Sequence, residues 1–235
     1  MRMDAVLGGM ALGVVATLGL VGCAGEEDPI PAPDFPEGTG QPAANAARYP
    51  AGPYGVNPGR VIANYQFVGY ANADADNDTM QPIQLADFYN PTGTEVFPEG
   101  SQYGAGEPKP KVLLIDVSSV WCGPCRIEAE SVLPRLYEKY QPLGGEFLMQ
   151  LADGRNPGEP AVALDLRRWT TQYEVKYPSA IDPSYKLGAL FQSDAFPANM
   201  LVRTQDMTVI EVVAGVPAED SNFWRTFEKI MNGEI

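Results

Sequence analysis

Residues 111–125, KVLLIDVSSVWCGPC, decide the fold of this 235-residue chain. Lys111–Val117 is a nearly unbroken apolar run, which is typical of a central strand that is covered on both faces. We expect a helix to follow, from the Cys-Gly-Pro-Cys segment to about Tyr140, because apolar residues there recur on one stripe. The two cysteines therefore lie where a buried strand passes into a helix.

The pattern stays regular on both sides of this stretch. Downstream, the expected elements are a strand, a helix, a short helix, a hairpin and a final helix, at residues 146–151, 161–173, 182–191, 200–214 and from Asp220 or Ser221 onward. Upstream, Val61–Val68 and Ile83–Phe88 favour strands or a strand and turn, and residues 90–110 favour a loop. This order predicts an α/β fold with a mixed central sheet, helices on both faces and an N-terminal strand extension.

Cys122 and Cys125 are the candidate reactive groups. The N–H groups and dipole of a helix N-terminus favour negative charge, so Cys122 is expected to ionise readily and attack, while Cys125 resolves the mixed disulfide. Pro124 suits the first helical turn, where its missing N–H is not needed. A structural disulfide and half of a zinc site are the alternatives. The zinc alternative lacks ligands, because the chain has no histidine and three cysteines in all.

The segment WCGPC after a buried strand resembles thioredoxin, and residues 58–235 resemble the exported, membrane-tethered TlpA/ResA-like branch of that superfamily. The resemblance implies a thioredoxin fold. It also implies that Asp116 is a buried carboxyl that moves the proton of Cys125, and that the Phe196–Pro197 bond is cis. The implied active-site and groove residues are Trp121, Gly123, Pro124, Phe196, Pro197 and Gly215.

The sequence also departs from this family. Arg126 and Glu128 fit the C-R-x-E start of the branch, but Glu130 stands where a helix-kinking proline is usual, and a proline follows only at Pro134. Gln150 stands near the place of the lysine that partners the aspartate in cytoplasmic thioredoxins. Proton handling by Asp116 would therefore proceed without that lysine.

The N-terminus is typical of an exported lipoprotein. Arg2 precedes an apolar run from Ala5 to Leu20, which as a helix would span about 24 Å at ~1.5 Å per residue, too short for a permanent membrane span. The following Leu-Val-Gly-Cys resembles the bacterial lipobox, with Cys23 as the lipidated residue. We expect a signal peptide at 1–22, a Pro/Gly-rich tether at 23–58 and the thioredoxin-like domain at 59–235. A plain signal peptide with an incidental cysteine is the alternative.

Charge excludes one class of function. The net charge of −14 repels phosphate backbones, so nucleic-acid binding has no electrostatic basis. Asp74, Asp76 and Asp78 match the first ligand positions of a calcium loop, but Thr79 and Leu85 stand where that loop needs glycine and glutamate. A solvated turn is the better interpretation.

These observations predict a thiol–disulfide oxidoreductase with no cofactor beyond its Cys122–Cys125 disulfide. We expect a monomer, lipid-anchored on the periplasmic side, in the outer membrane, that reduces disulfides of exported proteins and is kept reduced by a membrane electron donor. The alternatives are a dithiol oxidase or isomerase, and a non-catalytic lipoprotein that binds peptides in the thioredoxin groove. Copper delivery would require histidine, which the chain lacks. Peroxidatic cysteines normally have no partner two residues on.

Overall fold

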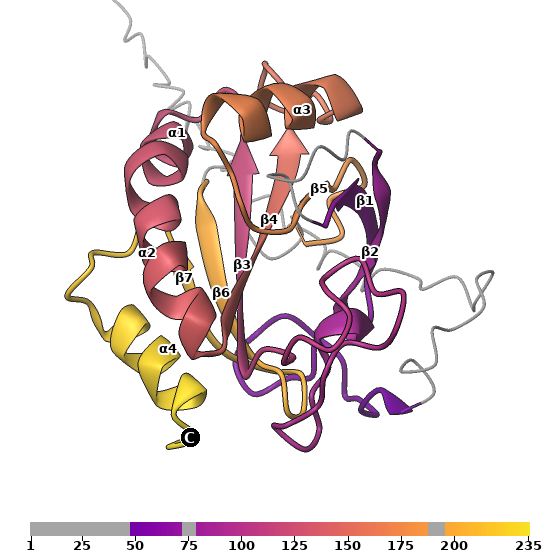
Figure 1. Cartoon of the computed structure of the whole chain (residues 1–235). Helices are drawn as coiled ribbons and strands as arrows, with labels where there is room; N and C mark the ends of the chain where they lie inside the picture. Colours follow the sequence, from indigo (N-terminus) through magenta and orange to yellow (C-terminus); the bar gives the residue numbers. More distant parts are fainter. Residues whose placement is uncertain (1–47, 72–78, 188–195) are drawn as a thin grey trace, which may run out of the picture. The chain divides into compact units, whose positions relative to one another are not determined.

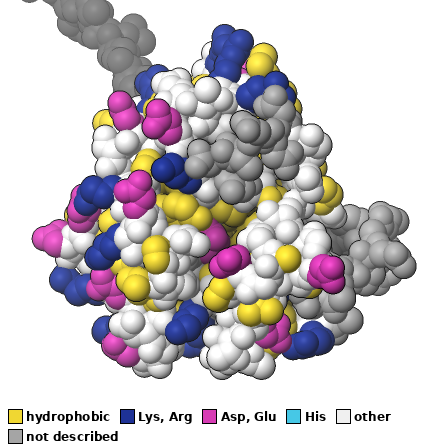
Figure 2. Space-filling model, viewed as in Figure 1, with side chains coloured by type: hydrophobic (Ala, Val, Ile, Leu, Met, Phe, Trp, Pro, Cys, Tyr) yellow, Lys and Arg dark blue, Asp and Glu magenta, His cyan; other side chains and the backbone are white. Residues whose placement is uncertain are grey.

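A computed structural model describes residues 48–71, 79–187 and 196–235 of the chain (Figure 1). The expected signal peptide, Cys23, most of the tether and the aspartates at 74, 76 and 78 lie outside these residues. In the described segments no helix is both long and apolar enough to cross a membrane. On the face that Figure 2 shows, acidic and basic side chains are interspersed rather than gathered by sign.

Seven strands form one mixed sheet, in the order β2-β1-β5-β4-β3-β6-β7. Their bounds are Gln66–Tyr70 (β1), Gln81–Gln84 (β2), Val112–Ser119 (β3), Gly145–Asp153 (β4), Ser179–Ile181 (β5), Ala198–Arg203 (β6) and Thr208–Ala214 (β7). The central strands β3, β4 and β5 are parallel, and the remaining pairs are antiparallel. The predicted α/β fold with a mixed sheet is confirmed.

The sheet separates two apolar layers. Every residue of β3 is buried, and alternate residues contribute to opposite layers, as expected for a strand that is covered on both faces. One layer holds apolar side chains from α1 (Gly123–Ile127), α2 (Leu133–Tyr140), α3 (Ala163–Gln172) and α4 (Asn222–Met231), and Figure 1 shows α2 beside α4. The other layer is covered by the segments before β3, including the 3₁₀ helix Leu85–Phe88.

The helix that follows the cysteines is interrupted in its middle. Glu128–Val132 forms a π-helical turn between α1 and α2. Pro134 supplies no N–H for the carbonyl of Glu130, and the Leu133 N–H bonds instead to the carbonyl of Glu128, five residues earlier. The bend that the sequence left undecided is thus a widening of the helix just before Pro134.

Three local differences from the sequence analysis stand out. The short strand β5 was not anticipated. Residues 183–187, expected to begin a helix, form turns, because the Asp182 carboxylate accepts the N–H groups of Lys186 (2.9 Å) and Leu187 (2.8 Å). Part of the expected tether also packs on the domain. The Tyr49 hydroxyl donates to the Ile62 carbonyl at 2.8 Å, so contact with the fold begins before residue 58.

Candidate active site

Cys122 and Cys125 form a disulfide at the end of β3, with their Cα atoms 5.3 Å apart. Cys122 is the N-cap of α1, and its sulfur accepts the backbone N–H of Cys125 at 3.1 Å. Pro124 lies in the first helical turn, where no N–H is required. The geometry therefore directs a helix N-terminus at the sulfur of Cys122.

The two sulfurs differ in access. Cys122 retains 3% of its surface and Cys125 has none. An incoming thiol or disulfide can reach only the sulfur of Cys122, which agrees with the order of roles expected from the sequence. Gly123 and Pro124 lie beside it, half-buried and exposed respectively.

The surroundings of the disulfide come from two other segments. The peptide bond between Phe196 and Pro197 is cis, the conformation that the resemblance predicts. The ring of Phe196 meets the indole of Trp121 edge to face, with centroids 5.9 Å apart. Gly215, at φ 82°, donates its N–H to the Pro197 carbonyl at 2.7 Å, so it joins the end of β7 to the cis-proline.

Asp153, which was not among the residues predicted from the sequence, fixes the indole of Trp121. Asp153, almost fully buried at the end of β4, accepts the indole N–H of Trp121 at 2.8 Å and the N–H of Gly158 at 3.0 Å. Its other oxygen accepts the hydroxyl of Tyr185. A polar residue at the carboxyl end of a buried parallel strand was the available signal.

Asp116 lies in the helix-covered layer beneath the disulfide. It is buried, and this burial raises its pKa to about 7, while a 2.9 Å hydrogen bond from Ser118 opposes the rise. Met149 is its cross-strand partner on β4. Gln150, one residue further, has the opposite orientation in the alternation of the strand, so it does not replace the lysine of cytoplasmic thioredoxins.

Glu128 is a second buried carboxyl in this layer. Cys125 and Glu128 are three residues apart on one helical face, and neither has any exposed surface. Burial, and next the charge of Asp116, raise the pKa of Glu128 well above its usual value, while a hydrogen bond from Asn199 opposes the rise. In the sequence, Glu128 is recognisable only as part of the C-R-x-E pattern of the family. A glutamate on the apolar stripe of the helix was the signal for a functional role.

The two carboxyl groups form an incompletely bonded polar cluster with Tyr177. Asp116 Oδ1, Glu128 Oε2 and the Tyr177 hydroxyl are buried and have no hydrogen-bond partner in the described part of the chain. Burial, followed by the charges of Asp116 and Glu128, raises the pKa of Tyr177. Two adjacent buried carboxyls do not both ionise easily, so this cluster is able to hold or release a proton near neutral pH.

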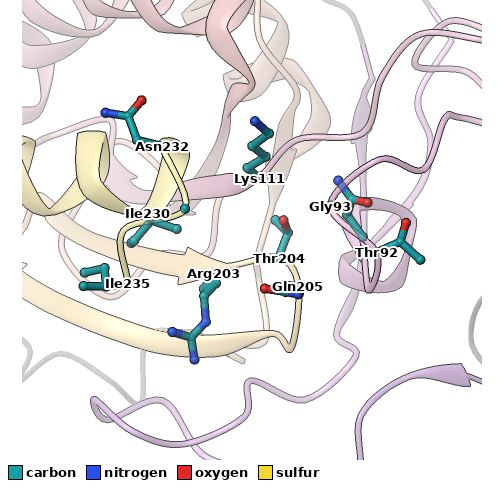
Figure 3. Close-up of a pocket in the computed structure, with 11 residues that line it drawn as sticks. Thr92, Gly93, Lys111, Arg203, Thr204, Gln205, Ile230, Asn232 and Ile235 are labelled. Atoms are coloured by element: carbon teal, nitrogen blue, oxygen red, sulfur yellow. The ribbon is translucent and has the colours of Figure 1, made fainter.

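The described residues contain no group of three or more Cys, Asp or Glu side chains arranged to hold a metal ion. A cavity of about 290 Å³ lies at the other end of the sheet, near Lys111 and Arg203 (Figure 3). Its buried polar residues bond to the backbone: Asn90 donates to two carbonyls and Thr204 to one. The cavity lies at the start of β3 and the disulfide lies at its end, so the two are separate.

Comparison with known proteins finds relatives that share one activity. No family model matches the chain. Thiol-disulfide oxidoreductase ResA of Bacillus cereus is 28% identical over 149 residues, covering 63% of this chain and 79% of the relative. The ResA of Bacillus anthracis matches with the same identity and coverage. The chain is therefore similar to the ResA proteins and has the thioredoxin fold. It is a thiol–disulfide oxidoreductase.

Solved structures agree on the fold of this ResA-like protein. A thiol:disulfide interchange protein DsbE from Chlorobium tepidum superposes with a TM-score of 0.53 at 17% identity, covering 75% of this chain and 99% of that one. A structure described as a protein disulfide isomerase from Bacteroides thetaiotaomicron gives a TM-score of 0.52 at 13% identity, covering 78% and 94%. At these identities the likeness concerns the thioredoxin fold alone.

Proposed function

We propose that the protein reduces disulfide bonds in exported proteins by exchange at Cys122 and Cys125. The observation that carries the proposal is the sulfur of Cys122 at the N-cap of α1, where it accepts the Cys125 N–H and is the more accessible of the two sulfurs. In the reduced protein the same N–H and helix dipole would stabilise a thiolate.

The first step is attack by the Cys122 thiolate on a substrate disulfide. A bond forms between Cys122 and one substrate sulfur, and the substrate S–S bond breaks with release of the other sulfur as a thiolate. The substrate would meet Cys122 beside the Trp121–Phe196 ring pair and cis-Pro197. An extended substrate segment would pair with the backbone beside Pro197.

The second step is resolution by Cys125. Its thiol proton passes to the buried carboxyl pair, Asp116 and Glu128, and its sulfur attacks Cys122. The mixed disulfide breaks, and the second substrate sulfur leaves as a thiolate that takes a proton from water. The substrate disulfide thereby gains two electrons, and the Cys122–Cys125 disulfide forms. Support for a carboxyl base is the burial of both groups and the raised pKa of each.

The direction of exchange rests on the dipeptide between the cysteines. Gly123-Pro124 matches thioredoxin, a strong reductant at about −270 mV. A reductase must be reduced again after each turnover, so we include a membrane electron donor in the proposal. No partner chain is needed to complete the site, which supports action as a monomer.

We further propose that the protein works in the cell envelope as a lipoprotein. The support is the resemblance to exported relatives, the apolar run ending at Leu20 and the lipobox at Cys23. The tether would hold the domain away from the lipid headgroups, and a non-Asp residue after Cys23 favours the outer membrane. Labelling with a radioactive fatty acid tests this proposal. Cys23→Ser should abolish labelling, and a Cys23→Ser protein that remains labelled would contradict it.

The equilibrium with glutathione tests the direction of exchange. We expect a midpoint near −270 mV for the Cys122–Cys125 couple, whereas a value near −120 mV would identify an oxidase. A Cys122→Ser, Cys125→Ser variant provides the baseline without exchange.

Trapping identifies the substrates. Cys125→Ser stops the reaction after the first step, so it should accumulate mixed disulfides with exported proteins. Cys122→Ser is the matched control and should trap none. Equal absence of trapped partners and of insulin reduction would favour a peptide-binding module instead.

A further inference from the structure

Asn199 connects the carboxyl cluster to Gly215, the residue that follows β7. It lies on β6, two residues after cis-Pro197, with no exposed surface, and it is the cross-strand partner of Asp116. Its side-chain amide donates to Glu128 Oε1 at 3.0 Å and lies 3.4 Å from the carbonyl oxygen of Gly215. One side chain thus contacts both the buried base and the glycine that follows β7.

Burial of a side-chain amide in an apolar strand lowers stability unless hydrogen bonds compensate for the lost contact with water. Asn199 interrupts a strand whose other residues up to Val202 are buried and apolar. Its carbonyl oxygen Oδ1 is buried and meets no donor among residues 48–71, 79–187 and 196–235. The amide is therefore placed for what its N–H gives to Glu128 rather than for complete hydrogen bonding of its own.

The surroundings of Glu128 make this donor important. The titratable groups that face it are Asp116 from β3, Cys125 from α1 and Tyr177 from the segment before β5. In the described structure, no lysine or arginine contributes to the pKa of either carboxyl. Among the described residues, the Asn199 amide thus supplies the one hydrogen bond that favours the ionised form of Glu128.

We propose that Asn199 is a positioning residue that holds Glu128 in place as a proton acceptor for Cys125. Asn199 fixes one oxygen of Glu128 and leaves Oε2 available to the thiol. Because two adjacent buried carboxylates repel each other, the pair holds one proton between its two members near neutral pH. This inference rests on the proposed second step, in which the Cys125 proton passes to the pair.

The reaction of the reduced protein with the aromatic disulfide DTNB has two phases, which separate attack by Cys122 from resolution by Cys125. Attack by Cys122 releases the first thiolate, and attack by Cys125 releases the second. Asn199→Leu has similar size but no donor. It should leave the pH profile of the first phase unchanged and move the midpoint of the second phase up by about one pH unit, because loss of the donor raises the pKa of Glu128. Asn199→Thr retains a hydroxyl donor and should restore the midpoint in part.

Two outcomes separate this inference from the proposed mechanism. If Glu128→Gln moves the second phase but folded Asn199→Leu does not, the role of Asn199 is refuted and the carboxyl base stands. If neither variant moves it, Glu128 is not the base for Cys125, and the role of Asn199 falls with it. Should Asn199→Leu not fold, Asn199→Ala removes the same donor without bulk, and an NMR titration of ¹³C-labelled Glu128 in that variant must show the raised pKa.

Discussion

The two ends of β3 both carry buried polar side chains, but they bond them differently. At the Lys111 end, Asn90 donates to the carbonyls of Lys109 and Pro110, both at 3.1 Å. The side-chain oxygen of Asn90 accepts the Glu95 N–H at 3.0 Å. Both polar side-chain atoms of Asn90 therefore have hydrogen-bond partners.

At the disulfide end the polar atoms are left incomplete. Asp116, Glu128 and Asn199 each have one buried oxygen without a hydrogen-bond partner within the described segments. Buried polar groups in proteins are almost always bonded, so exceptions that gather beneath one disulfide require an explanation. The contrast indicates that the Lys111 end serves stability and that the disulfide end gives up stability for proton transfer.

The largest expected effect is at the disulfide itself. Cys122→Ser should lower the rate of insulin reduction by at least about a thousandfold, because the more accessible cysteine of the pair is lost. Thermal unfolding of this variant is the control for folding. Substantial residual activity would place the reaction elsewhere in the molecule.

Glu128→Gln should sharpen the contrast between the ends. The amide has similar shape but cannot accept the Cys125 proton, so insulin reduction at neutral pH should fall by about a hundredfold. The free energy of unfolding should rise, by roughly 1 kcal/mol, because a buried carboxyl is replaced by a neutral group. A variant that is less stable and fully active would break the comparison.

Asn90→Ala should show the opposite pattern. It removes the side-chain partner of the Lys109 carbonyl and of the Glu95 N–H, while the Pro110 carbonyl keeps its hydrogen bond from Thr204. We expect a loss of about 2–3 kcal/mol in the free energy of unfolding. Urea denaturation measures this loss. The rate of disulfide exchange per folded molecule should not change, and a fall in that rate would show that the two ends are coupled.

Asp116→Asn should have a smaller effect, visible as a change with pH. The pKa of Asp116 is about 7 in the folded protein and near ~3.9 in an unfolded chain. Between these values the folded state binds the extra proton, so this carboxyl makes stability fall as pH rises from about 4 to 7. The slope has an upper limit of about 1.4 kcal/mol per pH unit.

Urea denaturation of the wild type and of Asp116→Asn between about pH 4 and pH 7 shows whether stability falls as the pH rises. Relative to wild type, Asp116→Asn should become progressively more stable as pH rises. A constant difference would mean that Asp116 ionises in the folded protein as it does in the unfolded chain.

Much of the fold could be predicted because its determinants are local. A short stretch of sequence is enough to predict the strand before Cys122 and the helix after it. The cis bond at Pro197 was predicted from the family resemblance. The strand β5 was missed because it has three residues between Pro178 and Asp182, too few for a period to appear. Asp182-Pro183 predicts a helix at 183–187, where the structure has turns, because an Asp-Pro pair begins both kinds of structure.

The candidate site was predicted at its sulfurs but not in its supporting residues. Cys122 and Cys125 identify themselves by spacing, whereas Glu128, Asp153 and Asn199 act through contacts between segments that are distant in the chain. A polar residue inside an apolar strand or stripe was the only sequence signal for them. Which neighbour such a residue contacts depends on strand order and register, which composition and spacing do not determine.

The pKa of the Cys122 thiol in the reduced protein is the most direct test of the account. It is measured from the pH dependence of alkylation by iodoacetamide, with Cys125→Ser to isolate the one thiol. A helix N-terminus and the Cys125 N–H predict a value at least about one unit below the ~8.5 of free cysteine. A value at or above that of free cysteine would contradict the account.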